Sequence, residues 1–186
     1  MDTLEGQRIC LRPLQLSDAD ALVNAAMPLI PQHFILHETE HWIVNHRLNS
    51  ALPGYVMLGA RANVNALHEL PESALAELGP LLAKTQRIVE MLFKPKRLYI
   101  GRYGHEPGHP IHFHVIPIYD WVEDMFWQDA RYRVLETFSS PNPESLTDGA
   151  ELTLFVWREF CERPDPPTAP GMTVEAAISH LREAFV

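Results

Sequence analysis

Apolar and polar residues alternate along several short segments in the middle of the chain, and this period of two predicts β-strands. The segment 35–46 is interpreted as two short strands joined by a polar turn near residues 38–40. Three further segments, 55–61, 97–103 and 111–119, each show the pattern of a single strand. Glycine, proline and asparagine lie between these segments, where turns are expected.

A different period, of three to four residues, marks the expected helices. Leucine, isoleucine and valine recur at this spacing from 75 to 92 and predict one long helix that begins near 71 and ends at 93. Helices are also predicted at 151–160 and at 174–185, where Thr173 is the expected N-cap. The first of these two would bury one side, formed by Leu152, Phe155, Val156 and Phe160. Residues 121–128 could form a short helix or a turn.

The order of these elements, with strands on both sides of one long helix, favours an α+β fold with an antiparallel sheet of about five strands. We divide the chain into an N-terminal strand and helix extension (1–32), a central domain (33–138) and a C-terminal helical extension (139–186). Residues 8–22 resemble the first strand and helix of GNAT acetyltransferases. The glycine-rich loop that holds the coenzyme of those enzymes is absent, so we do not expect an acetyltransferase.

Charge and composition narrow the class of partner. The chain has 186 residues and a formal net charge of −9, which would repel a nucleic acid but would not exclude a small phosphorylated ligand. Cys10 and Cys161 are far apart and are expected to be free thiols. The acidic first residues do not resemble a secretory signal, and no apolar run reaches membrane-spanning length. We therefore expect a cytoplasmic protein that does not bind membranes.

The clearest candidate chemistry lies in GHPIHFHVIP, residues 108–117, which holds His109, His112 and His114. Because side chains alternate between the two faces of a strand, His112 and His114 share one face. We expect that face to be reachable by solvent, and the opposite face, formed by Ile111, Phe113 and Val115, to be buried. His109 could join the pair only if the chain bulges at Gly108 or Pro110.

Two neighbouring imidazoles suit either metal binding or covalent catalysis. A zinc site would need further ligands, and His37 or His41 could supply one only if the fold brings it to the 105–114 segment. Covalent catalysis would need no metal, because an imidazole is partly neutral and nucleophilic near pH 7. A pair of surface histidines without function is the third alternative.

The stretch His112-Phe113-His114-Val115-Ile116-Pro117 resembles the end of the signature of the histidine triad (HIT) superfamily. The resemblance extends over roughly residues 35–120 and includes the strand, long helix and two strands that precede and contain the histidines. It implies a HIT-like antiparallel sheet, a homodimer, and a nucleotide or nucleoside phosphate as the small-molecule ligand. It further implies that His112 attacks the α-phosphate to form a nucleotidyl-histidine intermediate, that His114 helps to hold the phosphate, and that no cofactor or metal takes part.

Three positions depart from the family pattern. Pro110 stands where the first histidine of the triad is expected, Glu106 where a phosphate-binding glutamine is expected, and Tyr55 where an upstream histidine is expected. His109 could replace part of what is missing. These departures leave two alternatives open, a catalytically impaired nucleotide-binding or regulatory protein, and a metal-dependent phosphoesterase that uses the histidine cluster.

Other polar residues complete the predicted substrate site. Asn45, at the end of a predicted strand, is in a position to contact a ribose in the proteins that the chain resembles. Arg102, beside the histidine strand, and Arg61, at the end of another strand, are candidates for binding the phosphate.

Overall fold

The structure of the protein is a computed structural model that describes residues 30–104, 109–132 and 149–186. Predictions for the N-terminal strand and helix before residue 30, for Glu106, and for the C-terminal extension before residue 149 lie outside these residues. Within the described ranges, no helix combines the length and the apolar character that a membrane span requires.

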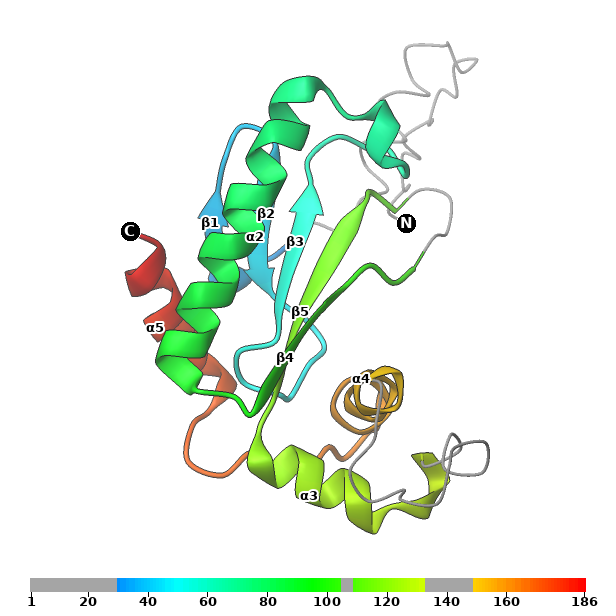
Figure 1. Cartoon of the computed structure of the whole chain (residues 1–186). Helices are drawn as coiled ribbons and strands as arrows, with labels where there is room; N and C mark the ends of the chain where they lie inside the picture. The colour runs from blue at the N-terminus through cyan, green and yellow to red at the C-terminus, as the bar shows by residue number, and fades with distance from the viewer. Residues whose placement is uncertain (1–29, 105–108, 133–148) are drawn as a thin grey trace, which may run out of the picture.

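Five antiparallel strands form a sheet in the order β1-β2-β3-β5-β4 (Figure 1). This arrangement confirms the predicted α+β fold with a five-stranded antiparallel sheet. Each strand lies within a segment whose alternating pattern predicted it, with ends shortened by one or two residues. The strands are β1 (Ile35–Glu38), β2 (Trp42–His46), β3 (Val56–Ala60), β4 (Arg97–Gly101) and β5 (His112–Ile118).

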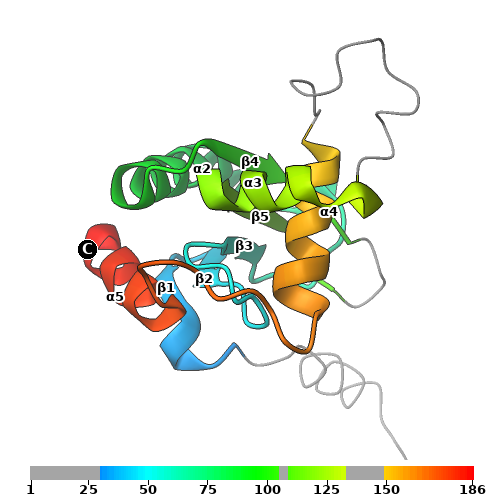
Figure 2. The same ribbon diagram turned by 90° about the horizontal axis from the view of Figure 1, so that it is seen from below.

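One face of the sheet is covered by the long helix α2 (Glu72–Phe93) and by α5 (Val174–Phe185), as Figure 2 shows. Thr173 caps α5, because its hydroxyl accepts a hydrogen bond from the backbone N–H of Ala176 at 3.2 Å. Apolar side chains from both helices meet those of the strands in a first core, which includes Val44, Val56, Leu58, Val115, Leu81, Ile88, Val89 and Leu181.

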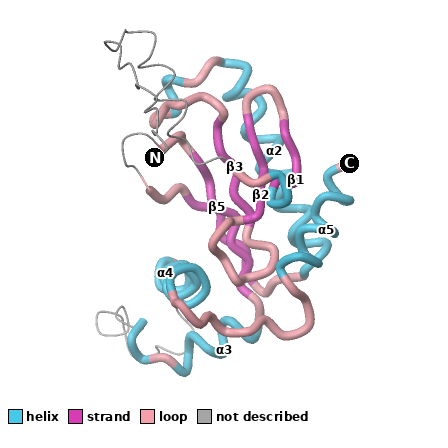
Figure 3. Tube along the Cα trace, turned by 180° about the vertical axis from the view of Figure 1, so that it is seen from behind, coloured by secondary structure: helices cyan, strands magenta, loops and turns pink. Residues whose placement is uncertain are grey.

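The opposite face of the sheet is covered at one end only, near the end of β5 (Figure 3). There α3 (Asp120–Gln128) and α4 (Ala150–Trp157) pack on the strand, and a π-helical turn, η6 (Arg158–Glu162), continues α4. Their second core contains Ile116, Ile118, Val122, Phe126, Leu152, Phe155, Val156 and Phe160. Short 3₁₀ turns complete the described elements: η1 (Gln32–Phe34), η2 (Leu67–Glu69) and η3 (Ala130–Tyr132).

The packing of α4 explains its sequence pattern. The four apolar residues that were predicted to form one side, Leu152, Phe155, Val156 and Phe160, are all buried in this second core. The helix does not continue as an α-helix to residue 160, because the backbone changes to the wider π-helical turn directly after Trp157. Such turns are rare and often lie beside functional sites.

Candidate active site

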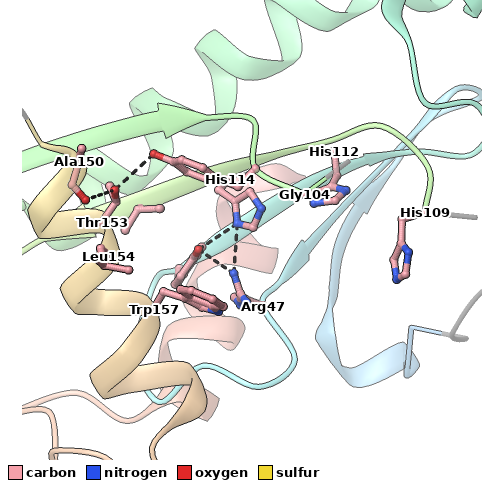
Figure 4. Close-up of a pocket in the computed structure, with 12 residues that line it drawn as sticks. Arg47, Gly104, His109, His112, His114, Ala150, Thr153, Leu154 and Trp157 are labelled. Atoms are coloured by element: carbon pink, nitrogen blue, oxygen red, sulfur yellow. Dashed lines mark hydrogen bonds between the residues drawn. The ribbon is translucent and has the colours of Figure 1, made fainter. Parts of the chain in front are cut away.

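A pocket of about 630 Å³ opens between the second face of the sheet and α4 (Figure 4). The two histidines of β5 lie on its floor, and Arg47 lies beside them. Tyr55 also lines the pocket, and its hydroxyl contacts both Arg47 and His114. Residues of α4 form the opposite side. The pocket therefore joins a polar surface from the sheet to a largely apolar surface from the C-terminal helix.

His112 is held in one orientation by the residue two positions before it. Its Nδ1 lies 2.9 Å from the backbone carbonyl oxygen of Pro110. A carbonyl oxygen can only accept a hydrogen bond, so Nδ1 carries the proton and the neutral ring keeps its lone pair on Nε2. Pro110 has no imidazole, but its carbonyl is sufficient for this contact.

Two glycines leave space around the His112 ring. Gly59 pairs with His112 across the sheet and places no side chain beside it. Gly104 has a φ of +78°, and a Cβ atom on it would lie 3.5 Å from Nε2 of His112. A side chain at Gly104 would narrow the access of a ligand to the nitrogen that carries the lone pair.

His114 lies deeper than expected from the strand pattern. Only 5% of its surface is exposed, because the rings of Tyr55 and Tyr103 pack against it. Its Nδ1 lies 2.9 Å from the hydroxyl of Tyr55 and 3.2 Å from Nη1 of Arg47. The expectation of two solvent-reachable imidazoles is therefore wrong for His114, because Tyr55 and Tyr103 cover this face and the alternating pattern along β5 does not encode such contacts.

The protonation state of His114 follows from these partners. An arginine can only donate, so Nδ1 accepts and the proton of the neutral ring is on Nε2. That Nε2 is buried and has no hydrogen-bond partner among the described residues. Burial, the charge of Arg47 and the neighbouring His112 together lower the pKa of His114 to about 3, while the backbone of Tyr103 acts in the opposite direction. The ring of His114 is therefore neutral at physiological pH, with its proton on Nε2.

Arg47 supplies the positive charge of the pocket. Its Nε donates to Oδ1 of Asn49 at 3.0 Å, and its Nη1 donates to the hydroxyl of Tyr55 at 2.9 Å. Within the described part of the chain, Arg47 has no ion pair with a carboxylate, and its Nη2 makes no hydrogen bond. Two N–H groups of a fixed guanidinium are thus available to an anion in the pocket.

Arg47 escaped the sequence analysis because it follows a strand without belonging to any motif. One signal was present: it is a basic residue placed directly after β2 and before the turn that leads to β3. Only the pairing of β3 with β5 brings this turn beside the histidines, through Met57 opposite His114.

The side of the pocket opposite the histidines is formed by one stripe of α4, which we call the α4 stripe: Ala150, Thr153, Leu154 and Trp157. These positions follow helical spacing, so they lie on one side of the helix, next to its buried side, and Thr153 is the buried member. Leu154 and Trp157 are 43% and 38% exposed. Tyr103 connects the stripe to the histidines, because its hydroxyl bonds Oγ1 of Thr153 at 3.3 Å and its ring edge contacts His114.

The other predicted substrate-binding residues lie in different places. His109 lines the pocket, whereas Glu106 is outside the described residues. Asn45 is buried, and its amide donates to the backbone carbonyl of His46 at 2.7 Å, away from the pocket lining. Arg102 donates to the side chain of Asn65 at 2.8 Å, and Arg61 pairs with Glu38 at 2.6 Å. Neither arginine lines the pocket.

Neither His37 nor His41, the two histidines considered for a zinc site, lines this pocket. His37 stacks on Phe185 of α5, with ring centroids 5.2 Å apart, on the face of the sheet opposite the pocket. Across residues 30–104, 109–132 and 149–186, no group of three or more His, Cys, Asp or Glu side chains is arranged to hold a metal ion.

Comparison with known proteins adds a likeness in fold. Several of the solved structures that this chain resembles are described as Hit-like or histidine triad proteins. The C. elegans NitFhit protein matches with 22% identity and a TM-score of 0.44, over 50% of this chain and 23% of that one. A Hit-like protein from Bartonella henselae matches with 12% identity and a TM-score of 0.48, over 90% of this chain and 95% of that one.

A zinc-bound histidine triad family protein from Mycobacterium smegmatis matches with 14% identity and a TM-score of 0.47, over 88% of each chain. No protein-family model and no curated protein sequence matches the chain. The likeness therefore concerns the fold, and we take function from the side chains of the pocket.

The buried state of His114 predicts how stability depends on pH. The folded-state pKa, about 3, is below the ordinary value of 6.5, so the unfolded chain binds a proton on this ring first as the pH falls. The contribution of the neutral His114 ring to the free energy of unfolding has its full value above pH 6.5 and is lost as the pH falls toward 3. We expect the difference in unfolding free energy between the wild type and His114→Gln to shrink by about 1.4 kcal/mol per pH unit between about pH 6 and pH 4.

Urea unfolding of both proteins across this pH range measures the difference. Comparison with the variant removes the contribution of His46, which is also buried and also has a lowered pKa. Parallel pH profiles for the two proteins would show that His114 takes up its proton near the ordinary value.

Proposed function

We propose that the protein is a nucleotide-binding hydrolase or nucleotidyl transferase of histidine triad type. The observation that carries the proposal is His112, whose Nδ1 is held by the carbonyl of Pro110 while Nε2 keeps its lone pair within the pocket. A nucleophile must be held in place with its lone pair toward the substrate, and this contact fixes the neutral ring in the tautomer whose Nε2 carries the lone pair.

The reaction that suits this geometry has two steps at the α-phosphorus of a nucleoside phosphate derivative. Nε2 of His112 forms a bond to phosphorus, and the bond from phosphorus to the leaving group breaks, with the leaving atom taking a proton from water. Water, or an alcohol in a transferase, then attacks the same phosphorus and breaks the P–N bond. During the intermediate, the Nδ1 proton stays hydrogen-bonded to Pro110.

The reaction also requires a group that stabilises the negative charge on the phosphate oxygens. Arg47 meets this requirement with a permanent charge, and His114 holds the guanidinium in place because its Nδ1 accepts a hydrogen bond from Nη1 of Arg47 at 3.2 Å. We infer that Arg47 does the electrostatic work for which the sequence suggested Arg102 or Arg61. The hydrogen bond of Arg47 to His114 sets the orientation of both groups.

Trapping of the intermediate tests this function. We expect wild-type protein incubated briefly with ³²P-labelled adenosine 5′-phosphoramidate to carry label that is stable to alkali, lost in acid and mapped to His112 by mass spectrometry, as phosphohistidine-type bonds require. His68→Ala, which removes an exposed histidine outside the pocket, is the matched control and should label normally.

The departures from the family pattern give the same experiment a second outcome. Pro110 and Tyr55 replace two imidazoles, so the alternative is a pocket that binds nucleotides without turning them over. Adenosine monophosphate binding by calorimetry, with neither label nor hydrolysis, would support that alternative. Absence of both label and binding would remove both functions. The homodimer and the cytoplasmic location expected from the sequence stay predictions.

A further inference from the structure

The side-chain amide of Asn49 connects the phosphate-binding arginine to the C-terminal helix. Its Oδ1 accepts a hydrogen bond from Nε of Arg47 at 3.0 Å, and its Nδ2 donates to the backbone carbonyl of Cys161 at 3.3 Å. Asn49 is exposed and does not line the pocket, so any effect that it has on a ligand passes through Arg47. The chemistry of His112 does not explain why these two contacts are present.

The two partners of Asn49 fix which way its amide points. The Nε–H of an arginine can only donate, and a backbone carbonyl can only accept. An asparagine side chain offers one acceptor and one donor, which is the combination that these partners need. An aspartate at position 49 would place a second acceptor against the carbonyl of Cys161. The pair of contacts therefore requires a neutral amide.

The carbonyl that accepts from Asn49 belongs to the end of the C-terminal helix. The π-helical turn η6 closes with a hydrogen bond from the backbone N–H of Arg163 to the carbonyl of Arg158 at 3.1 Å. Arg163 is extended, with a φ of −67° and a ψ of 129°, and it precedes Pro164, which has no N–H. The last carbonyls of the helix therefore need donors from another part of the chain.

The turn between β2 and β3 supplies these donors. The backbone N–H of Ala51 donates to the carbonyl of Phe160 at 2.8 Å, next to the contact of Asn49 with Cys161. A shift of the turn relative to η6 would lengthen both hydrogen bonds. The end of the helix thus holds in place the segment of chain that carries Arg47.

Contacts at two different nitrogens hold the guanidinium of Arg47. Its Nη1 contacts the hydroxyl of Tyr55 at 2.9 Å and Nδ1 of His114 at 3.2 Å, and Figure 4 shows the contact with His114. Asn49 acts on Nε, on a different side of the group. A planar group held at one nitrogen can still turn about that contact, whereas a second contact fixes its plane. Asn49 therefore determines the direction of the N–H groups that Arg47 offers to an anion.

We propose that Asn49 is a positioning residue that fixes the guanidinium of Arg47 for phosphate binding by anchoring it to the end of the C-terminal helix. The proposal rests on the proposed function for the identity of the ligand and adds the residue that preorganises the phosphate site. The C-terminal helix is accordingly part of the phosphate site, although the carbonyl of Cys161 acts only through Asn49 and Arg47.

Replacement of Asn49 in two backgrounds tests this role. We expect Asn49→Ala to lower kcat/KM for adenosine 5′-phosphoramidate by about 10-fold, mainly through kcat, because a misaligned guanidinium loses more in the transition state than in the ground state. In the Arg47→Gln background the same change should lower kcat/KM by less than about 2-fold, since the group that Asn49 positions is absent. Asn63→Ala truncates an exposed asparagine outside the pocket and should leave kcat/KM unchanged in both backgrounds.

Asn49→Asp separates the neutral amide from the mere presence of an acceptor. A carboxylate keeps the contact with Nε of Arg47, but it cancels the charge of the guanidinium and cannot donate to Cys161. We expect kcat/KM to fall at least as far as in Asn49→Ala. A value equal to or above that of the wild type would overturn the proposal, because the anchor to the helix would then be unnecessary.

The titration of His114, followed by NMR in the ligand-free protein, gives a measurement that needs no reaction. The charge of Arg47 helps to lower the pKa of His114, so a loosely held guanidinium should let that pKa rise. We expect the pKa to rise in Asn49→Ala by less than in Arg47→Gln, and to rise no further when the two changes are combined. Asn63→Ala should leave the pKa of His114 unchanged.

The outcomes distinguish the positioning role from the proposed function. Hydrolysis by the wild type, with kcat/KM and the pKa of His114 both unchanged in Asn49→Ala, would overturn the role and leave the proposed function intact. Equal losses of kcat/KM from Asn49→Ala in both backgrounds would also overturn it, because Asn49 would then act independently of Arg47. If the wild type does not hydrolyse the phosphoramidate, the proposed function fails and the titration decides. A rise confined to proteins that keep Arg47 would support the role, and no rise would overturn it.

Discussion

Replacement of His112 by alanine is expected to lower kcat for adenosine 5′-phosphoramidate by about 10⁴-fold or more, because the covalent step loses its nucleophile. Binding of adenosine monophosphate should change little, since Arg47 and His114 keep their contacts with each other and with Tyr55. Steady-state kinetics for kcat and calorimetry for product affinity measure the two effects separately.

The His112→Ala experiment needs a control for trace contamination and for general damage. His68→Ala, an exposed histidine of η2, should have wild-type kcat and a wild-type thermal unfolding temperature. Hydrolysis by His112→Ala at the wild-type rate would exclude the nucleotidyl-histidine intermediate, and any remaining activity would have to use water directly.

Removal of the charge at Arg47 is expected to have the next largest effect. Arg47→Gln should lower kcat/KM by about 10²- to 10³-fold, as loss of one preorganised donor to a developing oxyanion does in other enzymes. Arg47→Lys should recover only part of the loss. Lysine keeps the charge but cannot donate at once to Asn49, Tyr55 and His114 as the guanidinium does.

A second consequence distinguishes the electrostatic role of Arg47 from a structural one. Arg47 is one cause of the lowered pKa of His114, so its replacement should raise that pKa toward 6.5, although burial will keep it below this value. The histidine titration followed by NMR measures this shift. Arg102→Gln is the matched control, because Arg102 bonds Asn65 and does not line the pocket. Equal losses of kcat/KM in both variants would contradict the special role of Arg47.

The positive group of the pocket is Arg47, and this choice of residue determines how the charge of the pocket responds to pH. An arginine keeps its charge throughout the physiological range, whereas a histidine loses it near neutrality. Because the lowered pKa of His114 keeps its ring neutral in neutral and weakly acidic solution, the pair of Arg47 and His114 carries one positive charge throughout that range. The backbone carbonyl of Pro110 orients the ring of His112, although position 110 carries no imidazole.

Much of the architecture could be predicted from the sequence because it depends on local periodicity. Alternation with period two located the strands, and helical spacing located α2 and α5 within a few residues. The shared face of His112 and His114 followed from the same rule, since neighbouring positions on a strand point to opposite sides. Thr173 was predictable as a cap because its hydroxyl acts on a backbone N–H three residues away.

The composition of the pocket depended on contacts between residues far apart in sequence. Arg47, Tyr55 and His114 meet only because β3 pairs with both β2 and β5, and no local pattern encodes that order of strands. The burial of His114 and the apolar stripe of α4 are likewise consequences of how side chains pack across elements. Periodicity along the chain determined which residues of a strand or helix share a face. Tertiary packing alone decided which residues of different elements meet, because hydrogen bonds and burial depend on distance in space.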